Sequence, residues 1–275
     1  SVDGSMPLGA VVTGILILRG ADPRLCLLAA FAGGAAAGAL TGALHVRLHI
    51  RPLLCGILTN TALLSVNLVL LLKCNGGSSV AAFFRKPTIF TVFPATLMPE
   101  GIGGIRLRQL FMALLLAAIC KLLLKKKKKT KSGLLLRATG DNARFVAMLA
   151  RDPGRSKILG LALGNGFAAL AGSVIAQSKS SADQQMGVGM VVLGLSSVII
   201  GLSLFRRWTF LQKTTMVVLG SIAYKACLSI ALALGLPTEY LKLLMAALFV
   251  AALLAGEPAK KGLLQKRIGR FHHAA

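Results

Sequence analysis

Long runs of apolar residues recur along the sequence, and they constrain its fold more than any other feature. A membrane-spanning helix needs roughly 20 apolar residues, because the hydrocarbon core of a bilayer is about 30 Å thick. Runs bounded by charged or turn residues cover 7–19, 25–44, 52–72, 108–124, 157–177, 185–205, 214–235 and 239–256. We therefore predict an all-α fold, a polytopic membrane helix bundle with about eight apolar segments, the first of which is short or broken.

The composition supports a membrane protein. Of the 275 residues, 55% are hydrophobic and 15% are charged, and the mean hydropathy is +0.75. These values exclude a disordered chain, a coiled coil and a collagen. The net charge of +24 would indicate a phosphate-binding surface in a soluble protein. In a membrane protein it is better explained by topology, so we expect no nucleic-acid partner.

The distribution of Lys and Arg predicts the orientation. Residues 121–157 hold twelve basic residues and two acidic ones, which is typical of a cytoplasmic loop. Counting spans outward from this loop places the basic tail, residues 257–275, on the same side. The predicted domain organisation is therefore a transmembrane domain over 1–256, interrupted by the cytoplasmic loop 121–157, and followed by a basic cytoplasmic tail.

Small and polar residues inside the apolar runs indicate how the helices pack. Gly34, Gly38 and Gly42 recur every four residues, a spacing that lets neighbouring helices approach closely. Asn60 and Asn67 are seven residues apart and so share one helix face, and other polar residues (Asn165 among them) also lie within apolar runs. A buried amide without a partner is costly in lipid. Hydrogen bonds between helices and the lining of a solute path both explain these side chains.

No arrangement of residues indicates catalysis. The acidic residues do not pair at helical spacing, the five cysteines lack metal-ligand spacing, and a phosphate-binding GxxxxGK[ST] loop is missing from the sequence. His45 and His49 have helical spacing but no carboxylate near them in the sequence. We expect no metal, no cofactor and no enzymatic activity, so any ATP hydrolysis belongs to a separate subunit.

The segment from Leu136 to Asp152 contains a short amphipathic pattern. Gly140 ends the preceding stretch, and Asp141 or Asn142 can cap a new helix. Residues with helical spacing then form an apolar stripe of Phe145, Met148 and Leu149. The pattern predicts a helix over about 141–150. Such a helix either rests on the lipid surface or docks into another protein.

Several strings together resemble one transporter family. They are Val2 to Ala10, Gly56 to Leu68, Leu136 to Ala150, Lys157 to Gly172 and Asp183 to Met190. The chain is similar to the permease subunits of bacterial ABC importers, in the group of branched-chain amino acid and ribose permeases, and most similar to their amino-acid-type relatives. Relatives usually carry one more apolar segment before the Val2-Asp3-Gly4-Ser5 string, so we expect that this chain lacks the family's first helix.

The resemblance implies a function and a set of partners. It implies a permease subunit in the bacterial inner membrane that forms the solute pathway. Two ABC ATPase subunits, an extracytoplasmic solute-binding protein and a second permease subunit, in a homodimer, would complete the importer, surrounded by membrane lipid. The helix over 141–150 would be the coupling helix that fits a groove on the ATPase, and amino acids are the implied substrate class.

The resemblance and the polar pattern together assign candidate site residues. The ATPase-coupling residues are Gly140, Asp141, Asn142, Arg144, Phe145, Met148 and Leu149. Transporters place solute sites at helix ends and broken segments near the midplane of the membrane. On that basis the solute-path residues are Asp3, Gly4, Ser5, Asn60, Asn67 and Asn165.

One alternative from another class stays open. A passive channel, or a structural membrane protein that organises lipids, needs no ATPase partner. Such a protein would hold anionic headgroups with the run Lys125–Lys129. An ATPase that co-purifies with the chain would distinguish the importer from this alternative.

Overall fold

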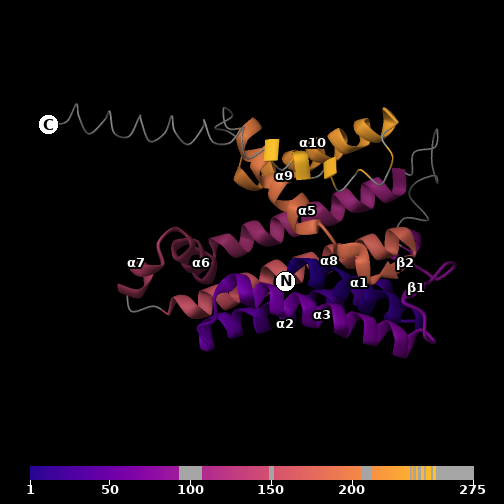
Figure 1. Cartoon of the computed structure of the whole chain (residues 1–275), viewed down its shortest axis with the longest axis horizontal. Coiled ribbons are helices and arrows are strands. Elements are labelled where there is room, and N and C mark those ends of the chain that lie inside the picture. Colours follow the sequence, from indigo (N-terminus) through magenta and orange to yellow (C-terminus); the bar gives the residue numbers. More distant parts are fainter. Residues whose placement is uncertain are drawn as a thin grey trace. The chain divides into compact units, whose positions relative to one another are not determined.

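The structure is a computed structural model that describes residues 1–92, 107–148, 152–205 and 212–235, with short pieces between 237 and 251. The chain divides into two compact units, Ser1–Val188 and Gly189–Ala275. Helices account for nearly all of the described secondary structure, as predicted (Figure 1). The basic tail over 257–275 lies outside the described residues.

The first unit contains most of the predicted apolar runs as helices. The elements, in chain order, are α1 (Val2–Leu18), α2 (Pro23–Arg47), α3 (Pro52–Cys74), β1 (Val80–Ala82), α4 (Ile89–Val92), α5 (Leu107–Lys129), α6 (Lys131–Asp141), α7 (Ala143–Met148), α8 (Pro153–Lys179), β2 (Ser181–Asp183) and the 3-10 helix η1 (Gln184–Gly187). Pro at the first turn of α2, α3 and α8 marks the helix starts, where its missing N–H costs nothing.

Helix α1 lies at the centre of this unit. It contacts α2, α3, α8, η1 and both strands, and twelve of its 17 residues are buried. The sequence predicted a short or broken first segment. The structure confirms a short segment of 17 residues, and this segment is one continuous helix that runs through Pro7. A helix surrounded by protein on all sides needs no polar face, and this explains why α1 is apolar all round.

The predicted glycine seam is confirmed between α2 and α8. An added Cβ at Gly38 would come within 2.8 Å of the Ala162 Cα, and one at Gly42 would come within 2.8 Å of the Ile158 Cα. At Gly34 an added Cβ would clash with the side chain of Ala169. The two helices therefore touch backbone to backbone along one side, which is possible only because α2 lacks side chains there.

A small sheet, not predicted from the sequence, joins two connecting segments. Strand β1 pairs antiparallel with β2, with Ala81 opposite Ala182. Both of these alanines are fully buried against the end of α1, together with Phe83. The strands are three residues long, too short for an alternating pattern to be recognised.

The lysine run belongs to a helix and not to a loop. Helix α5 continues through Lys129, and α6 begins after the cap Thr130, whose side chain accepts a hydrogen bond from the Gly133 N–H. The prediction that Gly140 ends the preceding stretch is wrong, because α6 continues through it to Asp141. The chain breaks at Asn142 instead, where the backbone is extended (φ −154°, ψ 97°), and α7 starts at the next residue.

The second unit contains α9 (Met190–Leu204) and α10 (Lys213–Ala233). The two helices pack through glycines, because an added Cβ at Gly220 would clash with the Ser197 carbonyl oxygen, and one at Gly201 would clash with the Met216 carbonyl oxygen. Tyr224 is buried in this unit. The last predicted run, 239–256, lies largely outside the described residues.

Among the described residues, five helical segments are long and apolar enough to cross a membrane: α2, α3, α8, η1 with α9, and α10. Helix α1 is apolar but shorter. Helix α5 is 23 residues long and ends in five lysines. The fold is an all-α membrane helix bundle, as predicted, although the structure does not establish eight segments.

Candidate functional site

Polar residues from three helices meet at the first turns of α1. Ser5 is fully buried, and its hydroxyl donates a hydrogen bond to Asn165 Oδ1 of α8 at 3.0 Å. Asn165 is 2% exposed, and its own amide nitrogen donates to the Leu161 carbonyl oxygen at 3.0 Å. The second bond fixes the orientation of the amide, so its oxygen faces α1.

Helix α3 supplies two more amides to the same place. Asn67, fully buried, donates from Nδ2 to the Gly4 carbonyl oxygen at 3.2 Å. Asn60 lies against the same glycine, because an added Cβ at Gly4 would come within 2.9 Å of Asn60 Oδ1 and of the Leu63 Cβ. Gly4 is therefore required for the close approach of α1 and α3. We call Gly4, Ser5, Asn60, Asn67 and Asn165 the α1 polar cluster.

Two amide oxygens of the α1 polar cluster keep unused acceptor capacity. Asn60 Oδ1 and Asn67 Oδ1 are buried and have no hydrogen-bond partner among the residues that the structure describes. A buried acceptor without a donor costs free energy, on the order of 1–3 kcal/mol. In membrane proteins, buried polar groups of this kind commonly mark solute or ion pathways. Each of these oxygens can accept a hydrogen bond from a donor, and the α1 polar cluster contains no nucleophile with an adjacent base.

Asp3, the remaining predicted path residue, directly precedes Gly4 in the first turn of α1 and is half-buried. Its backbone contacts η1, because an added Cβ at Gly187 would clash with the Asp3 carbonyl oxygen. The structure therefore brings all six predicted path residues to one end of α1. Their role in a solute path stays a prediction.

Sequence reasoning missed two buried polar contacts further along α8. The hydroxyl of Thr13 donates to that of Ser173 at 2.6 Å between α1 and α8, and both residues are fully buried. Gln177 accepts from the Ile89 N–H at 2.8 Å and donates to the Pro23 carbonyl oxygen at 3.4 Å. At 3.6 residues per turn, Ser173 and Gln177 lie about 80° and 120° around α8 from Asn165, so the three share only a broad sector of the helix, which is a weak signal in the sequence.

The predicted coupling residues lie at the break between α6 and α7. Gly140, Asp141 and Asn142 are exposed there. Met148 is 77% exposed, whereas Val146, which the predicted stripe did not include, is 1% exposed. The side chains of Arg144 and Phe145, and the whole of Leu149, lie outside the described residues. The segment thus anchors one apolar side chain in the protein and exposes another.

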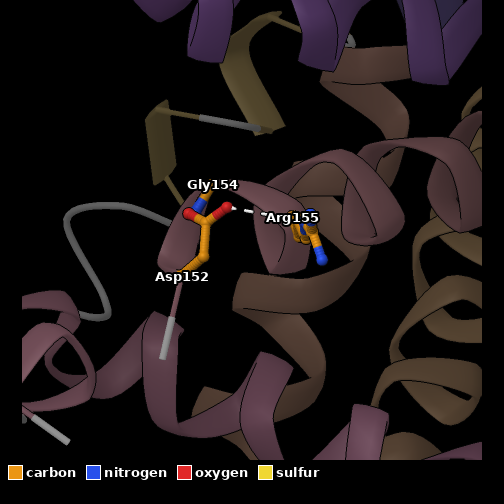
Figure 2. Close-up of polar contacts among 3 residues, drawn as sticks. All are labelled: Asp152, Gly154 and Arg155. Carbon is orange, nitrogen blue, oxygen red and sulfur yellow. Dashed lines mark hydrogen bonds and ion pairs between the residues drawn. The ribbon is translucent and has the colours of Figure 1, made fainter. Parts of the chain in front are cut away.

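Helix α8 begins directly after this segment (Figure 2). Asp152 caps the helix by accepting a hydrogen bond from the Gly154 N–H at 2.8 Å, and its other carboxylate oxygen lies 3.7 Å from Arg155 Nε. Both charged side chains are largely exposed, so the ion pair contributes little to stability. The cap fixes where α8 starts, and the same helix carries Asn165 to the α1 polar cluster.

No cluster of three or more potential metal ligands occurs within the described part of the chain. The five cysteines are free thiols, two of them buried.

Comparisons with known proteins identify similar sequences. Residues 1–253 match the family described as the branched-chain amino acid transport system permease component. The chain is 36% identical over 256 residues to the tyrosine transport system permease protein of Clostridioides difficile (strain R20291). The aligned region covers 93% of this chain and 81% of that protein. It is 28% identical over 249 residues to the uncharacterized protein RP368 of Rickettsia prowazekii (strain Madrid E), and this alignment covers 89% of this chain and 82% of that protein. No solved structure matches the chain significantly.

Proposed function

Because the chain belongs to the permease component family of branched-chain amino acid transport systems, we propose that it carries an amino acid across the membrane past the α1 polar cluster. The chain is a transmembrane permease subunit of an ABC importer and a multi-pass protein of the inner membrane. Members of this family are transport subunits and not enzymes. The observation that carries the proposal is the convergence of Ser5, Asn67 and Asn165 at the start of α1.

The chemistry of the α1 polar cluster fits an amino acid. Asn60 Oδ1 and Asn67 Oδ1 are hydrogen-bond acceptors, and an ammonium group carries three donors and no acceptor. The relative from Clostridioides difficile is named as a tyrosine permease, which makes tyrosine the first solute to test. Two neutral amides can bind an ammonium group without a buried carboxylate and can release it without separating an ion pair.

Permeases of ABC importers act in general with ATPase subunits and a solute-binding protein. For this chain we propose that two copies form a homodimer and that residues 121–157 face the cytoplasm, where the coupling segment, residues 141–150, contacts an ATPase. The tail over 257–275 lies on the same side, and the transmembrane domain spans 1–256. ATP hydrolysis takes place in the ATPase subunit.

Helix α8 is the mechanical link in this proposal. Its first residues follow the coupling segment, and its N-terminal half packs on α6, because an added Cβ at Gly160 would come within 2.8 Å of Leu136 Cδ1. Asn165 lies five residues further along. From Gly154 to Asn165 the helix rises about 17 Å at 1.5 Å per residue. A displacement of the coupling segment would thus reach the Ser5–Asn165 hydrogen bond through one continuous helix.

Reconstitution tests the proposed function. The full chain, its ATPase and its binding protein are placed in liposomes, and uptake of labelled tyrosine and of other amino acids is followed with and without ATP on the ATPase side. The proposal predicts uptake that requires both ATP and the binding protein. Uptake at the same rate without ATP would support a passive channel instead, and a complete lack of amino-acid uptake would contradict the proposed substrate class.

A further inference from the structure

Helices α5 and α8 enclose a lateral groove with a volume of about 370 Å³. Its walls are almost entirely apolar, and several of its small residues are exposed. The residues that define it are Ala113, Ala117, Cys120 and Leu124 on α5, and Phe167 and Ala171 on α8. From Ala113 to Leu124 the groove extends along α5 for about 16 Å. That length corresponds to one leaflet of a hydrocarbon core about 30 Å thick.

The lysine run continues the groove at one end. Positions 113, 117, 120 and 124 follow the 3.6-residue period of one helix face, and the next positions on this face are Lys127 and Lys128. Lys126 and Lys129 lie on the opposite face of the same two turns. All four side chains are exposed. The groove face of α5 therefore changes from apolar to cationic within a single turn.

Helix α6 packs on α5 at the lysine run. An added Cβ at Gly133 would come within 2.9 Å of the Lys128 Cα, and Leu136 packs on Gly160 of α8. From residue 101 to residue 140 the sequence contains no Asp or Glu, so this stretch is cationic throughout.

We propose that this groove binds an anionic phospholipid. One acyl chain lies between α5 and α8, and the phosphate group lies at Lys127 and Lys128. The complementary charge argues for a lipid over another apolar helix, because the cationic end of the groove attracts an anionic headgroup, which an apolar helix does not carry. The long lysine stems pack along the apolar wall while their ammonium groups reach the headgroup region. The proposal does not depend on the transported solute.

Lipid retention tests the headgroup part of the proposal. The full chain is exchanged into micelles that contain equal amounts of phosphatidylglycerol and phosphatidylcholine with the same acyl chains, and retained lipids are counted by native mass spectrometry. The parent should retain phosphatidylglycerol preferentially. The double variant Lys127→Gln/Lys128→Gln should reduce this preference by about ten-fold or more. The matched variant Lys126→Gln/Lys129→Gln removes the same charge from the opposite face and should keep the preference.

A second pair of variants tests the acyl-chain part. Ala117→Phe/Ala171→Phe fills the groove at exposed positions, so the fold should be preserved while retention of both lipids falls. Ala118→Phe adds a similar side chain to the same helix outside the groove and should change nothing. Equal retention of the two lipids by the parent, or an equal effect of the two lysine pairs, would overturn the proposal. Unchanged retention after filling would overturn it as well, because the groove would then hold no lipid.

Discussion

The Ser5 hydroxyl lies 3.0 Å from Asn165 Oδ1, although 160 residues separate the two positions in the sequence. This hydrogen bond connects the first helix of the described bundle to the helix that follows the coupling segment. It is fully enclosed by protein. Its loss should therefore affect both the stability of the bundle and the path that we assign to the solute.

Removing the Ser5 hydroxyl should destabilise the protein. Ser5→Ala leaves Asn165 Oδ1 buried without its donor, which costs on the order of 1–3 kcal/mol. Asn165→Ala should have a similar effect, and the double variant should lose less than the sum by about 1 kcal/mol. Denaturation in detergent micelles measures all three values. Ser221, whose hydroxyl bonds to Val218 of its own helix, provides the control, since Ser5→Ala combined with Ser221→Ala should be additive.

Gly38 and Gly164 should respond in opposite ways to the same substitution. Gly38→Ala forces α2 away from the backbone of α8 at Leu161 and Ala162, so we expect a lower thermal midpoint and a lower yield of folded protein. An added Cβ at Gly164 meets no atom of the described residues within 4 Å. Alanine there should be neutral or should stabilise α8 by up to about 1 kcal/mol through helix propensity. A Gly38→Ala protein as stable as the parent would contradict the packing of α2 on α8.

The helices could be predicted because their signal is local. An apolar run such as 25–44 predicts a span by length alone, and the four-residue glycine period in it predicts close packing. The partner of that seam could not be predicted, since Gly160 and Gly164 have the same four-residue spacing and so favour a seam at these glycines of α8. The structure uses Ile158, Leu161 and Ala162 on that helix instead. Tertiary contacts decide which face of a nearly uniform apolar helix is buried.

Residue 132 should be accessible only from the cytoplasm. Ser132, in α6, is exposed, and the basic residues around it oppose translocation. In a background without the five native cysteines, Ser132→Cys should react with an impermeant maleimide only after the cells are opened. Ser79→Cys is exposed and is separated from residue 132 by the single predicted span over 108–124, so it should lie outside and react in intact cells. Labelling of Ser132→Cys from outside intact cells would reverse the assigned orientation.

Phe145 should be an anchor for the ATPase. Truncating an aromatic anchor at an interface commonly costs about 2 kcal/mol, which corresponds to about a 30-fold loss of affinity. Phe145→Ala should therefore reduce ATPase co-purification and uptake together, while membrane insertion stays normal. Phe84→Ala removes an exposed aromatic side chain outside the coupling segment and serves as the control. ATPase binding at the parental level would favour a segment that only rests on lipid.

The candidate site could be predicted residue by residue but not as an arrangement. Asn60, Asn67 and Asn165 stand out because amides are costly in lipid. Nothing local to the sequence pairs Asn67 with the Gly4 carbonyl oxygen or Asn165 with Ser5. The coupling segment was predicted with the wrong break, because Gly140 continues α6. Glycine ends a helix when it adopts a left-handed conformation, and the chain turns at Asn142 instead.

The role of the α1 polar cluster can be tested at Asn60. Its side-chain oxygen has no hydrogen-bond partner among the described residues, so removing this oxygen breaks none of the hydrogen bonds between them. The measurement is the initial rate of ATP-driven amino-acid uptake in liposomes that contain the chain, its ATPase and its binding protein. Asn60→Ala should lower this rate by about ten-fold, as expected for the loss of a hydrogen bond to a charged group, with unchanged folding and ATPase binding. Thr61→Ala, at the exposed neighbouring position, should leave the rate unchanged. Parental uptake by Asn60→Ala would contradict a solute path at the start of α1.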